Sequence, residues 1–147
     1  MKSLNGVSIS ILALVVTVAS GMLANQTLHA QQAQTKSPDL LKDVKVTNLF
    51  RADVADMPGK ETIIQELEFP PGYSSGKHRH PGDTYIYVLN GSARMEEEGK
   101  EAPVTVNPGE VFYESPNGVY NFIPANGTKI LIVRIYEKGK PVSIPVK

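Results

Sequence analysis

The sequence contains no cysteine, and this absence limits both how the chain is stabilised and which chemistry it can perform. Without thiols the chain forms no disulfide, so packing and hydrogen bonds must hold the fold together. Thiolate metal sites of the zinc-finger type are excluded for the same reason. Any metal site must therefore use nitrogen and oxygen ligands, and the chain has only three histidines to contribute.

The sequence also lacks an excess of charge of either sign. Fifteen Lys and Arg are balanced by fifteen Asp and Glu, so no long-range field draws the protein toward a polyanion. We therefore expect no nucleic-acid partner. A chain of 147 residues with 41% hydrophobic content is long enough for one compact domain around a single core.

Long apolar runs are confined to the N-terminus. Residues 7–23 are mostly apolar, follow Lys2 and lead into LHAQQAQ, a pattern typical of a signal peptide. We predict a signal peptide over residues 1–30, a polar flexible linker over 31–39 and one folded domain over 40–147. The protein would then be exported, to a periplasm or beyond, with no stable membrane insertion once the leader is cleaved. An uncleaved anchor is the alternative, because the apolar run nearly reaches the length that spans a bilayer.

After the leader no segment has the period of an amphipathic helix. Apolar residues instead alternate with polar ones, and turn signals such as PPG, NG and NPG recur at short intervals. This pattern predicts an all-β sandwich or barrel. The expected strands are 44–50, 62–69, 84–89, 92–96, 104–106, 111–113, 120–123 and 129–136.

Two histidines, His78 and His80, stand in the stretch GYSSGKHRHPGDTYIYVLNG, separated by one arginine. In an extended chain, residues two apart project to the same side. If that side is the barrel interior, two imidazoles converge on one point. Three interpretations stay open: a functional metal pair, a metal-free polar pocket, and histidines without chemistry.

The surrounding spacing resembles the first conserved motif of the cupin superfamily, with Gly72, His78, His80, Thr84 and Gly91 at its named positions. The stretch NPGEVFYESPNGVYNFIPANGT, residues 107–128, resembles the second cupin motif. This resemblance implies an antiparallel double-stranded β-helix, the cupin barrel or jelly roll. Cupin metal centres usually take two histidines and a glutamate from the first motif and one histidine from the second.

In this chain the glutamate position is Thr84, and the second-motif histidine aligns with Tyr120 or, from Gly118, with Asn121. A neutral threonine hydroxyl is a weak metal ligand compared with a carboxylate. Substitute oxygens could come from Gln65, Asp83 or Glu114, although the sequence does not show that they reach the cavity. The resemblance implies a pocket lined by Gln65, Thr84, Tyr120 and Phe122 beside the two histidines.

The first functional hypothesis is a metal-dependent small-molecule enzyme, an oxygenase, isomerase or lyase. His78 and His80 would hold a divalent transition metal, such as iron, manganese, nickel or zinc, and Tyr120 would be the catalytic proton donor or acceptor. The alternative is a non-catalytic cupin that has lost its metal and binds a small polar ligand. In the cupin register Tyr85 and Tyr87 should face away from the pocket, and exposed aromatics of this kind are typical of interfaces. Because the resemblance to small cupins also implies a homodimer, we predict one.

Overall fold

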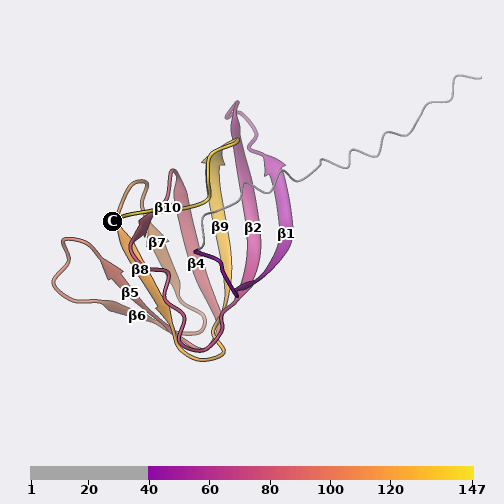
Figure 1. Ribbon diagram of the computed structural model, residues 1–147. Coiled ribbons are helices and arrows are strands. Elements are labelled where there is room, and N and C mark those ends of the chain that lie inside the picture. The colour runs from indigo at the N-terminus through magenta and orange to yellow at the C-terminus, as the bar shows by residue number, and fades with distance from the viewer. Residues whose placement is uncertain (1–39) are drawn as a thin grey trace, which may run out of the picture. The chain divides into compact units, whose positions relative to one another are not determined.

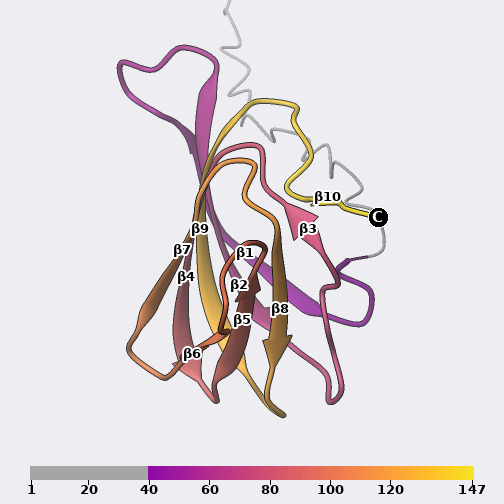
Figure 2. The same cartoon turned by 90° about the vertical axis from the view of Figure 1, so that its left-hand side faces the viewer.

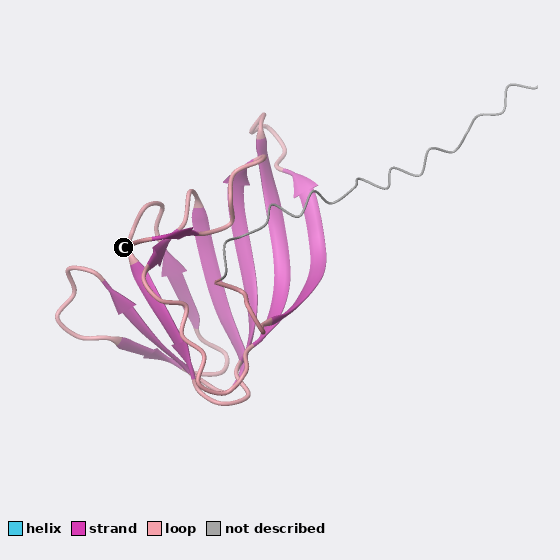
Figure 3. Cartoon of the chain, in the orientation of Figure 1, coloured by secondary structure: helices cyan, strands magenta, loops and turns pink. Residues whose placement is uncertain are grey.

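Alternation of apolar and polar residues produces a fold made of strands and turns (Figure 1). The computed structural model describes residues 40–147; the predicted signal peptide and linker lie outside them. The described residues form strands, turns and loops without a helix (Figure 3), and so none that could cross a membrane. The strands are β1 (Lys45–Asp53), β2 (Lys60–Glu68), β3 (His78–Arg79), β4 (Asp83–Asn90), β5 (Ala93–Glu97), β6 (Val104–Val106), β7 (Val111–Glu114), β8 (Tyr120–Pro124), β9 (Lys129–Glu137) and β10 (Ile144–Pro145).

The strands form two antiparallel sheets that face each other, as Figure 2 shows from the side. One sheet has the order β1-β2-β9-β4-β7, and the other has the order β10-β3-β8-β5-β6. Strands adjacent in a sheet are often distant in the chain, as where β9 lies between β2 and β4. The all-β prediction is therefore confirmed, and the two-sheet arrangement is consistent with a jelly roll.

The inner faces of the two sheets supply the core. In β4 the side chains of Thr84, Ile86 and Val88 are buried, whereas Tyr85 and Tyr87 are exposed, which confirms the predicted orientation of this strand. The same alternation in β9 buries every second residue. The main hydrophobic cluster comprises Leu67, Phe69, Ile86, Val88, Ala93, Met95, Val106, Phe122, Ile130 and Ile132.

Candidate metal centre

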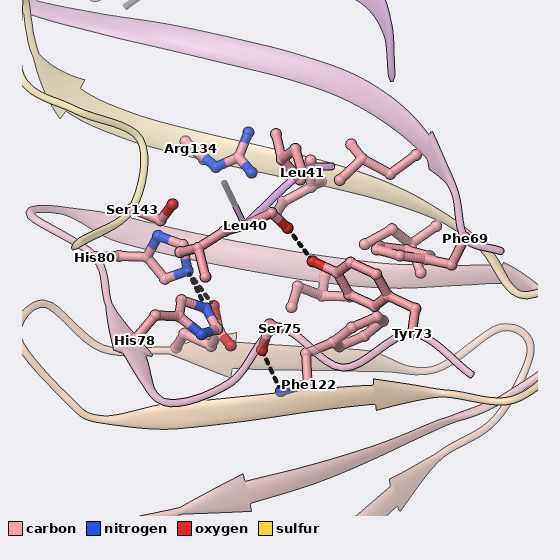
Figure 4. Close-up of a pocket in the computed structure, with 15 residues that line it drawn as sticks. Leu40, Leu41, Phe69, Tyr73, Ser75, His78, His80, Phe122, Arg134 and Ser143 are labelled. Carbon is pink, nitrogen blue, oxygen red and sulfur yellow. Dashed lines mark hydrogen bonds and ion pairs between the residues drawn. The ribbon is translucent and has the colours of Figure 1, made fainter. Parts of the chain in front are cut away.

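His78 and His80 come together inside the barrel as their spacing predicts. His78 belongs to the short strand β3, which pairs with Tyr120 of β8 on one side and with β10 on the other. The two imidazoles are 5% and 3% exposed. Their Nε2 atoms lie 3.1 Å apart, and the ring planes are nearly perpendicular at 87°. The two rings therefore present the same nitrogen to one point in the interior (Figure 4).

Backbone carbonyls determine which ring nitrogen of each histidine carries the proton. His78 Nδ1 lies 3.1 Å from the Gly76 carbonyl oxygen, and His80 Nδ1 lies 2.6 Å from that of Val142. A carbonyl only accepts hydrogen bonds, so each Nδ1 must be the protonated donor. In a neutral imidazole, Nε2 then carries a free lone pair. Burial lowers the pKa of His78, which favours this neutral form near pH 7.

The third member of the site is Glu114, at the end of β7. Its side chain is fully buried, and Oε2 lies 2.8 Å from His80 Nε2. Among the described residues neither carboxylate oxygen has a hydrogen-bond partner. Glu114 stands directly opposite Thr84 in the β4–β7 ladder, so a carboxylate reaches the interior from the neighbouring strand.

These three side chains fit the requirements of a divalent metal. One ligand atom from each of His78, His80 and Glu114 lies within 4.8 Å of the others. Bonds of about 2.0–2.2 Å at angles of 90–110° separate neighbouring ligands by roughly 2.8–3.6 Å, which includes both the 3.1 Å and the 2.8 Å separations. Two imidazoles and one carboxylate form a set that leaves other coordination positions open. Two facing lone pairs beside an unpartnered carboxylate are complementary to a cation.

Thr84 supports the site indirectly. Its hydroxyl is 2.6 Å from the Tyr136 hydroxyl, which in turn donates a hydrogen bond of 3.2 Å to the Val142 carbonyl. The same carbonyl accepts the His80 Nδ1 hydrogen bond. Thr84, at the usual glutamate position, therefore helps to hold the C-terminal segment that orients His80.

The histidines and Glu114 open onto a cavity of about 50 Å³, which has room for roughly four water molecules at 10–15 Å³ each. Its other walls are mostly apolar, and the Tyr73 hydroxyl donates a hydrogen bond to the Leu40 carbonyl, which ties the start of the domain beside the cavity (Figure 4). The lining residues are Leu40, Leu41, Leu67, Phe69, Tyr73, Ser75, His78, His80, Ile86, Glu114, Phe122, Ile130, Ile132, Arg134 and Ser143.

The predicted pocket residues do not all line the cavity. Phe122 lines the cavity, whereas Gln65 and Thr84 do not. Gln65 donates to the Asn48 side chain and accepts from Arg134. Asp83 accepts a hydrogen bond from Tyr113 in an exposed position. Of the three oxygen sources that the sequence offered, only Glu114 faces the histidines.

Tyr120 lies in the interior but outside the cavity lining. The residue is 2% exposed, and its hydroxyl accepts a 3.0 Å hydrogen bond from the Ser115 backbone N–H and lies 3.0 Å from the Ser115 hydroxyl. Asn121, the other second-motif position, bonds to Glu96 and Ser74 instead. Neither candidate for the second-motif position therefore takes the place of a fourth metal ligand.

Two features of the site were not anticipated from the sequence. Arg134 lies buried in β9 at the cavity wall, and Ser143 reaches it from the C-terminal segment. The alternation in KILIVRIYE carried a signal for Arg134, since this charged residue falls on the same face as Ile130 and Ile132. Ser143 gave no such signal because it belongs to a loop.

Comparison with known proteins agrees with this architecture. A family model described as a cupin domain matches residues 65–135. The Oxalate-binding protein of Thermotoga maritima is 30% identical over 63 residues, which are 42% of this chain and 50% of that protein. This chain thus spans about half the length of the curated relative that it matches.

Solved structures share the fold at lower identity. A cupin superfamily protein from Desulfitobacterium hafniense aligns with a TM-score of 0.54 and 18% identity, covering 64% of this chain and 78% of the other. The polyketide cyclase RemF from Streptomyces resistomycificus aligns with a TM-score of 0.54 and 23% identity, covering 72% of each chain. Likeness at this level of identity concerns the fold alone.

Proposed function

This chain belongs to the cupin superfamily, and on that premise we propose that it is a metal-dependent enzyme acting on a small molecule, an oxygenase, isomerase or lyase. His78, His80 and Glu114 would hold a divalent transition metal. The proposed ligand set differs from the usual cupin centre in two respects. The carboxylate comes from β7 and not from the first-motif position in β4, and in the described part of the chain no second-motif histidine joins the group of His78, His80 and Glu114.

One observation carries this proposal. Two Nε2 atoms that present lone pairs lie 3.1 Å apart, and a buried carboxylate oxygen lies 2.8 Å from one of them. When both histidines are neutral, these three acceptors have no proton between them, and a buried acceptor without a partner costs about 1–3 kcal/mol. A divalent cation satisfies all three at once, which is why we favour a metal over a metal-free polar pocket.

The residues around the site have distinct roles in this scheme. A bound metal would supply positive charge that polarises an oxygen of the substrate. The Val142 and Gly76 carbonyls accept the Nδ1 protons, which makes Nε2 the free ligand atom of each neutral histidine, and Glu114 would offset part of the cation's charge. The apolar walls, including Phe69 and Phe122, exclude water from the reacting group.

The alternative function is that of a binding protein without catalysis. A relative named Oxalate-binding protein and the small cavity favour it, and the hydroxyl of Tyr120 is engaged with Ser115 outside the cavity. Tyr73 is the one tyrosine among the described cavity-lining residues, and burial raises its pKa to about 12. Both tyrosines are therefore poorly suited to proton transfer near pH 7.

Metal analysis of the purified protein tests the metal site on which the proposed function depends. The protein is prepared without chelators and without a histidine tag, beside the His78→Ala, His80→Ala double variant. We expect close to one equivalent of a transition metal in the wild type and its loss in the double variant. Equal metal content in the two proteins would reject the site.

A ligand screen by thermal shift then separates enzyme from binding protein. A molecule that binds only the folded state raises the unfolding midpoint. Stabilisation by metal, together with turnover that disappears in the double variant, supports the enzyme. Stabilisation by small metabolites that is the same with and without metal, and without turnover, supports the binding protein.

A further inference from the structure

The cavity contains a second charged group, Arg134, that the metal site does not use. Arg134 projects from β9 toward the interior, is 3% exposed and lines the cavity with the two histidines (Figure 4). Its place in the sheet is defined by register, since Arg134 lies opposite Thr84, and Thr84 lies opposite Glu114. The backbone positions of Arg134 and Glu114 therefore lie two strands apart, about 9.5 Å across the sheet.

The partners of Arg134 leave part of its guanidinium unsatisfied. One Nη1 hydrogen bond goes to the Gln65 side-chain oxygen, which is neutral. Nε has no hydrogen-bond partner among the described residues. Within residues 40–147 no carboxylate forms an ion pair with this arginine, and Glu114 faces His80 instead, with Oε2 2.8 Å from Nε2. A buried charge without a counter-charge is costly unless a bound anion completes it.

The charges of the cavity make an anion the complementary ligand. Among the described lining residues, Glu114 is the one acidic side chain and Arg134 is the one arginine; none of them is a lysine. Glu114 is within electrostatic range of Arg134 but forms no ion pair with it. A divalent cation held beside Glu114 would take up that negative charge and leave the cavity with a net positive charge. Arginine retains its proton under all ordinary conditions, and its planar fork matches a carboxylate.

We propose that Arg134 is the carboxylate-binding residue of this cavity and that the ligand is a small carboxylate with an apolar body. The inference rests on the proposed function, because it names the class of molecule that the same site would take. The rest of the wall explains the apolar body, since aliphatic and aromatic side chains form most of it. Leu67, Phe69, Ile86, Phe122, Ile130 and Ile132 contribute these apolar surfaces. The small volume limits the ligand to a few heavy atoms beyond the carboxylate.

The test compares molecules of one shape that differ in charge. Calorimetry measures isobutyrate and its neutral analogue isobutyramide against the full protein, both metal-free and loaded with zinc. We expect isobutyrate to bind roughly tenfold to a hundredfold more tightly than the amide, as one charge-assisted contact provides. Equal binding of acid and amide, or no binding of isobutyrate by either form of the protein, would overturn the proposal. So would inorganic phosphate binding more tightly than isobutyrate.

Matched variants assign the effect to Arg134. Arg134→Gln should lose at least about tenfold in isobutyrate affinity, whereas Arg94→Gln, which removes an exposed arginine that pairs with Glu96, should change it less than about twofold. Arg134→Lys keeps the charge without the fork and should fall between wild type and Arg134→Gln. If Arg134→Gln does not fold, the lysine variant and the acid-to-amide ratio of the wild type still decide the matter. Unchanged affinity in Arg134→Lys and Arg134→Gln would contradict the assignment.

The metal-free measurement keeps this inference separate from the proposed function. If the protein binds no metal but still selects isobutyrate through Arg134, the anion site stands and the metal-dependent enzyme fails. If metal binds at the histidines while acid and amide bind alike, the metal site stands and the carboxylate site fails.

Discussion

At the scale of single residues, Glu114 decides what the site can hold. Its carboxylate is fully buried, 2.8 Å from His80 Nε2 and without a hydrogen-bond donor among the described residues. Such a group destabilises the metal-free protein and becomes favourable when a cation is present. Glu114 therefore raises the affinity of the protein for a metal and lowers the stability of the metal-free protein.

Glu114→Gln should separate these two effects. We expect metal affinity to fall by at least about 100-fold, since losing a ligand should exceed the 10–100-fold cost of losing an outer partner. The metal-free variant should be more stable than the wild type by about 1–3 kcal/mol, because the amide can donate to the His80 lone pair. Metal titration and urea unfolding measure both. The control is Glu101→Gln, an exposed position; a variant that binds metal like the wild type would refute the role of Glu114.

Tyr136 gives the protein a predictable response to alkali. Burial raises its pKa to about 12 from an ordinary value near 10, so the unfolded chain loses this proton first as the pH rises. Stability should therefore be intact below pH 10 and fall between pH 10 and 12, by at most about 2.7 kcal/mol for two units at 1.36 kcal/mol each. Urea unfolding at pH 8 and pH 11 should show a smaller alkaline loss for Tyr136→Phe. The exposed control Tyr87→Phe should lose as much stability in alkali as the wild type. If Tyr136→Phe loses as much as that control, the pKa of Tyr136 is not the cause of the alkaline loss.

At the scale of elements, the C-terminal segment belongs to the site. β10 pairs with β3, the Val146 N–H donates to the Lys77 carbonyl, and the Val142 carbonyl receives hydrogen bonds from His80 and Tyr136. A metal-binding histidine usually depends on the partner of its other nitrogen. The orientation of His80 therefore comes from a segment 62 residues away in the chain.

Removal of residues 141–147 should weaken the metal site while leaving the two sheets folded. β10 contributes only two residues to its sheet, so circular dichroism should still report β structure. Metal affinity should fall by roughly 10–100-fold. Deletion of Lys147 alone serves as the control and should have no such effect. A truncated protein that is folded and binds metal as tightly as the wild type would show that the Val142 carbonyl is dispensable.

The sequence predicts elements better than it predicts the contacts between them. Alternating hydrophobicity locates the eight longer strands to within a few residues, for example 104–106 for β6 and 129–136 for β9 (Lys129–Glu137). The strands β3 and β10 have two residues each, too few for any period to be visible. His78 and His80 were identified from local spacing, but the approach of Glu114 depends on the non-local β4–β7 register, which no local pattern encodes.

At the scale of the whole molecule, the outer face of β4 and β7 is the surface expected to meet a second copy. Tyr85 and Tyr113 are opposed in register with ring centroids 5.1 Å apart, and β7 is the edge strand of its sheet. Clustered exposed aromatic side chains are typical of interfaces. The exposed apolar residues of this face are Tyr85, Tyr87, Leu89, Val111 and Tyr113.

The homodimer remains a prediction that light scattering can test. We expect a dimer at micromolar concentration and a shift to monomer in Tyr87→Glu, because a charge buried in an apolar interface lacks a partner. Val104→Glu places the same charge on an exposed apolar residue of the other sheet and should leave the mass unchanged. A wild-type protein that is monomeric throughout this range would contradict the prediction.

The most direct test of the metal centre is anomalous X-ray diffraction from crystals of the protein purified with its metal. The account predicts one strong peak in the cavity, about 2.0–2.2 Å from His78 Nε2, His80 Nε2 and a carboxylate oxygen of Glu114. A peak that contacts the histidines but not Glu114 would contradict the proposed ligand set. No peak at these residues, in crystals supplied with iron, manganese, nickel or zinc, would contradict the metal centre itself.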